Sequence, residues 1–163
     1  METEQRAIVI AGFAGVGKST LARQAKYIQS RPVVELQKDS FLFGDDGTRN
    51  SNPSRGYVGT IMKRLSEPCI LLVQAHVDVR EALVDRGVDF YFVYPGRECR
   101  GDYCERYLRK GEADMARVYH TFWETFIGTC ERQDGCHHRR LEPRQYLDTA
   151  YVESLLRDRV SDR

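Results

Sequence analysis

Residues 7–28 read AIVIAGFAGVGKSTLARQAKYI, and this stretch decides the fold. Its first five residues are all apolar, which is typical of a strand buried in a parallel sheet. Its last part predicts a helix, because apolar residues recur there at helical spacing, at Leu21, Ala22, Ala25 and Ile28. A glycine-rich loop joins the two. The order of strand, glycine loop and helix predicts an α/β fold built around a phosphate-binding loop.

The loop from Gly12 to Ser19 has glycine, four free positions, glycine, lysine and serine. Glycines permit backbone angles and close approaches that a Cβ atom would block, so that N–H groups can converge on phosphate oxygens. Lys18 adds a positive charge, the hydroxyl of Ser19 suits Mg²⁺, and the following helix points its positive end at the phosphates. We therefore expect a nucleoside triphosphate to bind here, through Gly12, Ala14, Gly15, Val16, Gly17, Lys18, Ser19 and Thr20.

The length and charge of the chain restrict the classes of protein it can belong to. It has 163 residues, with 25 basic and 24 acidic side chains and a net charge of +1. This length predicts one domain with a single core over residues 1–163. The balanced charge gives no bulk attraction to nucleic acid, which is not a favoured partner, or to an anionic membrane. Because no apolar stretch has the length of a signal region or a membrane span, we expect a cytoplasmic protein.

Strand patterns and helix patterns alternate along the rest of the chain. We expect strands at 7–11, 33–36, 69–73, 90–94 and 138–141. Helices are expected after the loop and at 57–65, 78–85, 98–110, 112–130 and 149–160. The helix over 112–130 carries an apolar stripe that includes Val118 and Phe122, with Trp123 packed beside it. Strands separated by helices predict a three-layer fold, a parallel five-stranded sheet with helices on both faces.

Polar residues that follow the strands are the candidates for chemistry, because ligands bind at the carboxyl ends of parallel strands. Asp39 follows the second strand, where a carboxylate could orient an acceptor hydroxyl or hold a magnesium-bound water, or could cap a turn. His76 follows the third strand and could contact substrate or satisfy the strand end. Arg80 lies one helical turn later, where a joint anion site with His76 competes with a solvated helix face.

Basic residues are concentrated between Arg97 and Lys110. Helical geometry separates Arg106 from Arg109 by about 60° around the axis and places Tyr103 and Tyr107 on the opposite stripe. This spacing predicts that both arginines face outward, where they could close over a triphosphate and neutralise the charge of a transferring phosphate. The alternative is an exposed helix on which Arg109 pairs with Glu105.

Several of these segments together resemble the P-loop kinases. They are the loop from Gly12 to Ser19, Asp39, QAHVDVR at 74–80, VYP at 93–95 and YCERYLRKG at 103–111. The chain is most similar, to about Leu147, to short phage and bacterial proteins of the nucleotide-kinase-like type. In nucleoside monophosphate kinases, lid arginines reach the triphosphate; the resemblance implies this role for Arg106 and Arg109, on a small helical lid at about 97–112. It also implies that an arginine on the helix between the second and third strands contacts the acceptor phosphate, and Arg55 and Arg64 are the nearest candidates.

The sequence and the resemblance lead us to expect a phosphotransferase that depends on ATP and Mg²⁺ and acts on a nucleoside or deoxynucleoside monophosphate. Lys18 and the loop would hold ATP, Ser19 and Asp39 the metal, and Arg106 and Arg109 the transferring phosphate. Asp39, Arg55, His76 and Arg80 are the candidates for binding the acceptor. The alternatives are a kinase that acts on a hydroxyl of a polynucleotide end, nucleoside or other small metabolite, and a non-catalytic ATP-binding protein or ATPase. The absence of an Asn-Lys-x-Asp motif argues against a GTPase.

Overall fold

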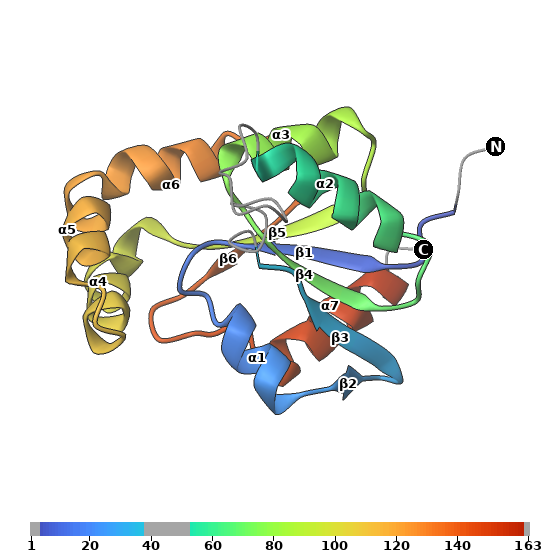
Figure 1. Cartoon of the computed structure of the whole chain (residues 1–163). Coiled ribbons are helices and arrows are strands. Elements are labelled where there is room, and N and C mark those ends of the chain that lie inside the picture. The colour runs from blue at the N-terminus through green and yellow to red at the C-terminus, as the bar shows by residue number, and fades with distance from the viewer. Residues whose placement is uncertain (1–3, 38–52, 162–163) are drawn as a thin grey trace, which may run out of the picture.

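A computed structural model describes residues 4–37 and 53–161 of the chain (Figure 1). The strands are β1 (Ile8–Gly12), β2 (Tyr27–Ile28), β3 (Arg31–Glu35), β4 (Ile70–Gln74), β5 (Phe90–Pro95) and β6 (His137–Leu141). The helices are α1 (Lys18–Gln24), α2 (Pro53–Arg64), α3 (Val77–Asp85), α4 (Arg100–Arg109), α5 (Ala113–Thr121), α6 (Trp123–Glu131) and α7 (Thr149–Ser161). A short 3₁₀ turn, η2 (Arg97–Cys99), precedes α4. No helix within the described ranges is long and apolar enough to cross a membrane.

The strands form one six-stranded, mostly parallel sheet in the order β2-β3-β4-β1-β5-β6. The five strands expected from the sequence are β1, β3, β4, β5 and β6, and their pairings are all parallel. The sheet of five strands was nevertheless one strand too few, because β2 adds an antiparallel edge against β3. The residues between them, Gln29 and Ser30, have left-handed φ angles of 50° and 67°, which turn the chain back on itself.

This hairpin also shortens the first helix. Apolar spacing predicted a helix that reached Ile28, but α1 ends at Gln24, and Ala25 is already extended. Ile28 is instead buried within β2, 2% exposed. A longer helix and the strand β2 would each bury Ile28, so the apolar spacing alone could not show which of the two forms here.

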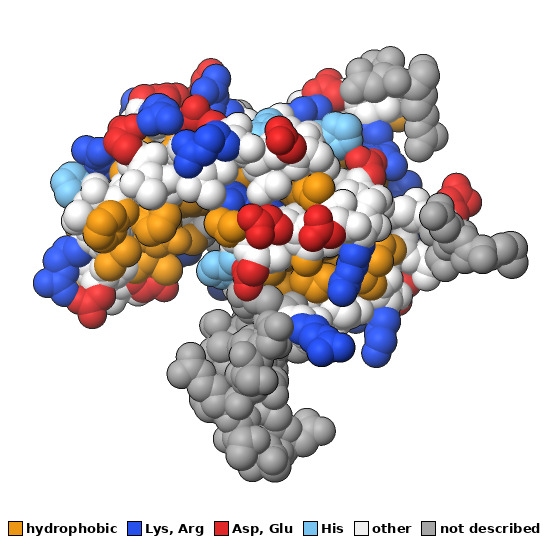
Figure 2. Space-filling model, turned by 90° about the horizontal axis from the view of Figure 1, so that it is seen from above, with side chains coloured by type: hydrophobic (Ala, Val, Ile, Leu, Met, Phe, Trp, Pro, Cys, Tyr) orange, Lys and Arg blue, Asp and Glu red, His pale blue; other side chains and the backbone are white. Residues whose placement is uncertain are grey.

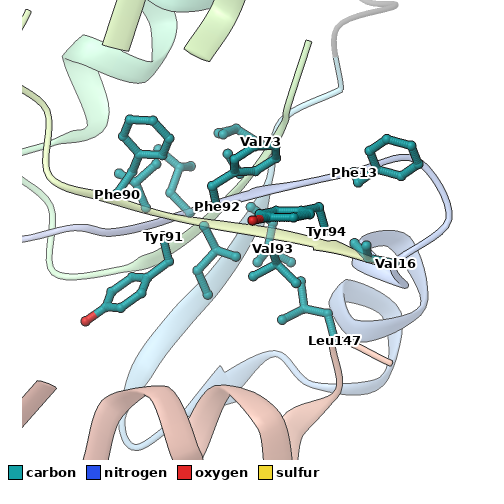
Figure 3. Packing of buried hydrophobic residues seen from close by; sticks show 14 of the residues in the cluster. Phe13, Val16, Val73, Phe90, Tyr91, Phe92, Val93, Tyr94 and Leu147 are labelled. Carbon is teal, nitrogen blue, oxygen red and sulfur yellow. The ribbon is translucent and has the colours of Figure 1, made fainter. Parts of the chain in front are cut away.

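Helices cover both faces of the sheet (Figure 1): α2, α3 and α6 lie on one face, and α1 and α7 on the other. The strand β5 is buried along its whole length. Side chains of β5 alternate between the two faces, so that Phe90 and Phe92 point one way while Tyr91 and Val93 point the other (Figure 3). Burying one such side chain contributes about 1.5–3 kcal/mol, so both layers of helices are held firmly to the sheet.

The segment over 112–130 is two helices rather than the one that was expected. The chain bends at Phe122, which has φ −107° and ψ 19° and both ends α5 and begins α6. Val118 and Phe122 are therefore about half exposed, at 47% and 52%, and do not belong to the buried stripe. Trp123 is fully buried as expected, and its indole N–H donates to the carbonyl of Arg97 at 2.9 Å.

Candidate active site

The phosphate loop begins where β1 ends, at the carboxyl edge of the sheet. Gly12 is in register with Gln74 of β4 and Val93 of β5, so β1 and β4 end there side by side while β5 continues to Pro95. Gly15 and Gly17 have φ angles of +93° and +114°, a region that L side chains rarely adopt. A Cβ atom on Gly12 would lie 2.8 Å from a methyl carbon of Val16. Each glycine that the sequence singled out therefore has a geometric reason.

Every carbonyl of residues 12–17 accepts a hydrogen bond. Three of the donors belong to the loop and the start of α1: Lys18 Nζ donates to Gly12 at 2.6 Å, Val16 N to Phe13 at 3.1 Å, and Leu21 N to Gly17 at 3.0 Å. The other three come from distant segments: Tyr107 Oη donates to Ala14 at 2.7 Å, Arg106 Nη1 to Gly15 at 2.8 Å, and Leu147 N to Val16 at 2.9 Å.

The amide groups of the same loop are used differently. Within the described residues, the N–H groups of Ala14, Gly15 and Gly17 donate to no other atom. With the carbonyls satisfied from α4 and from the segment before α7, these amides remain available for a bound anion. This is the arrangement that a phosphate-binding loop needs.

The ammonium group of Lys18 is packed into the loop. Its contact with the Gly12 carbonyl folds the side chain back over the end of β1. Burial lowers the pKa of Lys18 to about 8, an effect that Glu35 opposes and Lys110 adds to. An anion bound beside this group would raise its pKa again and stabilise the charged form, so the site favours negative ligands.

The hydroxyl of Ser19 donates to Glu35 Oε2 at 2.8 Å. The other carboxylate oxygen of Glu35 accepts a hydrogen bond from Gln37 at 3.2 Å. Sequence reasoning missed Glu35, although it lies in the strand expected at 33–36 and so near the carboxyl edge of the sheet. Asp39, the acid that was expected at this place, lies outside the described residues. The described part of the chain holds no group of three or more acidic, histidine or cysteine side chains around one point.

Arg106 does not face outward as expected. It is 4% exposed and bonds Asp102 Oδ2 at 2.8 Å, the Gly15 carbonyl and, at 2.9 Å, the carbonyl of Gln145. Its guanidinium carbon lies 4.2 Å and 3.8 Å from the ring centroids of Tyr103 and Tyr146. The expectation failed because the segment around Tyr146 covers the side of α4 that the helix alone would leave open.

Arg109, at the C-terminal end of this helix, is exposed. Its side chain is 61% exposed and pairs with Glu105 at 2.9 Å, the pairing that was considered as an alternative. The next residue, Lys110, lies near enough to Lys18 to lower its pKa. The C-terminal end of α4 thus brings positive charge close to the phosphate loop. Its inner face is part of the core, where Tyr103 and Tyr107 are buried.

A cavity of about 640 Å³ opens beside the loop. Gly12, Ala14 and Lys18 form one wall, and the end of β4 with the first turn of α3 forms another. The helices α5 and α6 close it with Met115, Tyr119, Phe126 and Thr129. Such a volume suits a small molecule. In a view onto the face formed by α2, α3 and α6, hydrophobic side chains gather at the end where α5 lies (Figure 2).

Two of the predicted acceptor residues line this cavity. His76 stands before α3, and its Nε2 contacts Gln74 Oε1 at 3.2 Å. Arg80 is only 2% exposed, so the solvated helix face considered for it is wrong. The reason is α6, which covers this part of α3 and brings Cys130 within 3.5 Å of Arg80 Nη1. Arg55 is exposed at the start of α2, outside the described lining of the cavity.

Comparisons with known proteins support the fold alone. The sequence matches no protein-family model and no curated protein. The fold is similar to that of a gluconokinase from Sinorhizobium meliloti 1021, with a TM-score of 0.51, 16% identity and coverage of 97% of this chain and 99% of that one. It is also similar to an uncharacterized protein from Eubacterium ventriosum ATCC 27560, with a TM-score of 0.50, 13% identity and coverage of 98% and 100%.

Proposed function

We propose that this chain is a kinase that transfers the γ-phosphate of ATP to a small acceptor, and that this acceptor is a nucleoside or deoxynucleoside monophosphate. One observation carries the proposal: the carbonyls of residues 12–17 all accept hydrogen bonds, while amides of the same loop are left for an anion. The adjoining cavity shares Gly12, Ala14 and Lys18 with the loop, so a donor and an acceptor can meet there. The similarity in fold to a gluconokinase supports the same class of reaction.

The residues present fit a magnesium ion. The hydroxyl of Ser19 and the carboxylate of Glu35 are hard oxygen ligands 2.8 Å apart beside the phosphate loop. We propose that these two groups hold Mg²⁺, directly or through its water ligands, and that Asp39 completes the set. The ion would neutralise charge on the phosphates during transfer.

The other residues bind and orient the donor. Lys18, charged below a pKa of about 8, would contact the phosphates that the loop amides hold. An acceptor oxygen forms a bond to the γ-phosphorus while the bond from that phosphorus to the β–γ bridging oxygen breaks, and ADP leaves. Arg109, with Lys110, would move over the transferring phosphate. Arg106 would hold the loop in shape rather than contact the phosphate.

A hydroxyl acceptor is the second candidate, because the neighbour with the similar fold is a gluconokinase, whose name specifies a sugar acid. In that case the hydroxyl proton must leave as the new bond forms, and Asp39 is the proposed base. A phosphate acceptor is already ionised and needs no base. The two candidates therefore differ in whether a carboxylate near the loop is required for proton removal.

Incubation with γ-labelled ATP and Mg²⁺ tests the proposal against a panel of acceptors. The panel consists of nucleoside monophosphates, the matching nucleosides, gluconate and a short oligonucleotide. We expect label in a nucleoside diphosphate, and none with a Lys18→Ala protein. Label in gluconate would establish the second candidate. Transfer to no acceptor, with ATP binding retained, would leave a nucleotide-binding protein and reject both kinases.

A further inference from the structure

In the part of the chain that the structure describes, Arg80 is a buried cation without a carboxylate partner. It is 2% exposed, and its polar contact is the sulfur of Cys130, 3.5 Å from Nη1. Its guanidinium carbon lies 4.5 Å from the ring centroid of Phe92, and Nε has no hydrogen-bond partner among residues 4–37 and 53–161. Within the described residues no acidic side chain is within ion-pair distance of it. A neutral sulfur and a ring compensate a buried guanidinium poorly, so a bound anion would stabilise Arg80 strongly.

The cavity beside the phosphate loop is where that anion can bind, because Arg80 lines it. His76, which precedes α3, and Val77 in its first turn also line this space. One acidic residue, Glu112, lines the cavity, and it forms no ion pair with Arg80. Arg80 and Lys18 are thus two positive groups of one cavity, the second of which belongs to the donor site.

The rest of the wall indicates what else the ligand carries. Phe13, Tyr119 and Phe126 line the cavity as one connected group of rings. The ring centroids of Phe13 and Tyr119 are 5.4 Å apart, and those of Tyr119 and Phe126 are 4.8 Å apart. Such a wall suits a planar ring better than a polyhydroxylated chain, which would need polar partners on every side.

We propose that Arg80 binds the anionic group of the acceptor, a phosphate or a carboxylate, while the aromatic wall packs against its ring. This inference rests on the proposed function, since it assigns the acceptor half of that site. It makes an anion a requirement, so a nucleoside or a neutral sugar would be a poor acceptor. The ring wall places a nucleoside monophosphate ahead of a sugar acid.

Acceptor binding is measured by calorimetry with the phosphate loop saturated by Mg²⁺ and a non-hydrolysable ATP analogue, so that added anions cannot bind there. For Arg80→Met we expect the affinity for the preferred anionic acceptor to fall roughly ten- to hundredfold, as for loss of charge-assisted hydrogen bonds. Arg80→Lys keeps the positive charge, so its affinity for the acceptor falls less. Arg86→Met, which removes an exposed arginine at the end of the same helix, leaves the affinity unchanged. We expect the affinity for the ATP analogue to be the same in the original protein and in the three variants.

The melting temperature without acceptor separates this role from a structural one. If the role of Arg80 is to bind an anion, the melting temperature of Arg80→Met is no lower than that of the original protein. The reason is that the substitution removes a buried charge that has no acidic partner among the described residues. If Arg80 instead stabilises the fold, its replacement lowers the melting temperature. Unchanged acceptor affinity in Arg80→Met, or in Arg80→Lys should the first variant not fold, overturns the inference. The inference is also overturned if the analogue-saturated protein binds none of three anions, namely nucleoside monophosphates, gluconate and inorganic phosphate.

The outcomes also separate the inference from the proposed function. Anion binding that depends on Arg80, without transfer to any acceptor, rejects the kinase and keeps the anion site. Transfer with an unchanged acceptor KM in Arg80→Met keeps the kinase and rejects the role of Arg80. The product distinguishes the two anions, since a nucleoside diphosphate requires a phosphate acceptor and a phosphogluconate requires a carboxylate ligand.

Discussion

The guanidinium of Arg106 donates to the carbonyl of Gly15 at 2.8 Å, across 91 positions of sequence. This bond attaches α4 to the phosphate loop through a carbonyl of the loop, whereas we propose that the loop amides bind the phosphates. Asp102 balances the charge of Arg106, and the rings of Tyr103 and Tyr146 enclose it. The loop therefore depends on α4 for its shape as well as on its own glycines.

Replacement of Arg106 by alanine tests this relationship. The change removes the side-chain donor to the carbonyls of Gly15 and Gln145 and, among the described residues, leaves Asp102 with only the backbone N–H of Arg144. Losing one member of a buried pair costs about 3–5 kcal/mol. We expect a lower free energy of unfolding in denaturant together with weaker ATP binding. Arg109→Ala, which removes an exposed pair with Glu105, should leave stability nearly unchanged, because solvent screens such a pair.

A different result for Arg106→Ala would restore the role that the resemblance implied. If turnover falls while stability and ATP affinity stay unchanged, Arg106 acts on the transferring phosphate, and it must leave its present contacts to do so. The comparison of ATP affinity with turnover therefore decides between a residue that shapes the loop and one that stabilises the transition state.

The loop glycines give a second prediction. Gly17→Ala places a Cβ atom at φ +114°, which costs about 1–2 kcal/mol of strain or a change in loop shape. We expect ATP affinity to fall at least tenfold, measured by titration calorimetry. The matched control is Gly59→Ala in α2, where a Cβ atom meets nothing within 4 Å. Since alanine favours a helix over glycine, this control should be stabilised by up to about 1 kcal/mol and bind ATP normally.

The sequence was sufficient to predict those elements whose local residue pattern agrees with their environment in the fold. Strands such as β1, β4 and β5 are apolar at consecutive positions because both faces of the sheet are covered, and the loop pattern specifies its own backbone angles. The hairpin at Gln29 and Ser30 was missed because it needs left-handed angles from residues that rarely adopt them.

Burial of the two arginines could not be predicted, because distant segments cause it. Arg106 is covered by Gly15 and Gln145, which lie 91 and 39 positions away, and Arg80 by Cys130, 50 positions away. A helical projection shows which residues share a face but not what later packs against it. The same limit explains why Glu35 was not predicted as a site residue. Its hydrogen bond with Ser19 is recognised only once the strands are placed next to the loop.

The pH dependence of ATP binding follows from Lys18. Its pKa in the folded protein is lowered to about 8, so before ATP binds the ammonium group loses its proton as the pH rises through that value. Bound phosphates require the charged form, so affinity should be constant below about pH 8 and fall up to tenfold per pH unit above it. Binding at pH 8.5 should also take up protons, detected as heats that differ between buffers. A flat profile to pH 9.5 would contradict the assignment.

Removal of one charge at Glu35 tests the magnesium site. In Glu35→Gln the amide oxygen can still accept the hydrogen bond from Ser19, so the fold should keep its stability while the metal loses an anionic ligand. We expect the Mg²⁺ concentration for half-maximal activity to rise about tenfold or more, with smaller change at saturating Mg²⁺. Glu67→Gln, at an exposed pair with Arg64, removes the same charge away from the loop and should leave this concentration unchanged. If both variants need the same Mg²⁺ as the original protein, Glu35 only orients Ser19, and Asp39→Asn becomes the variant that must raise the requirement.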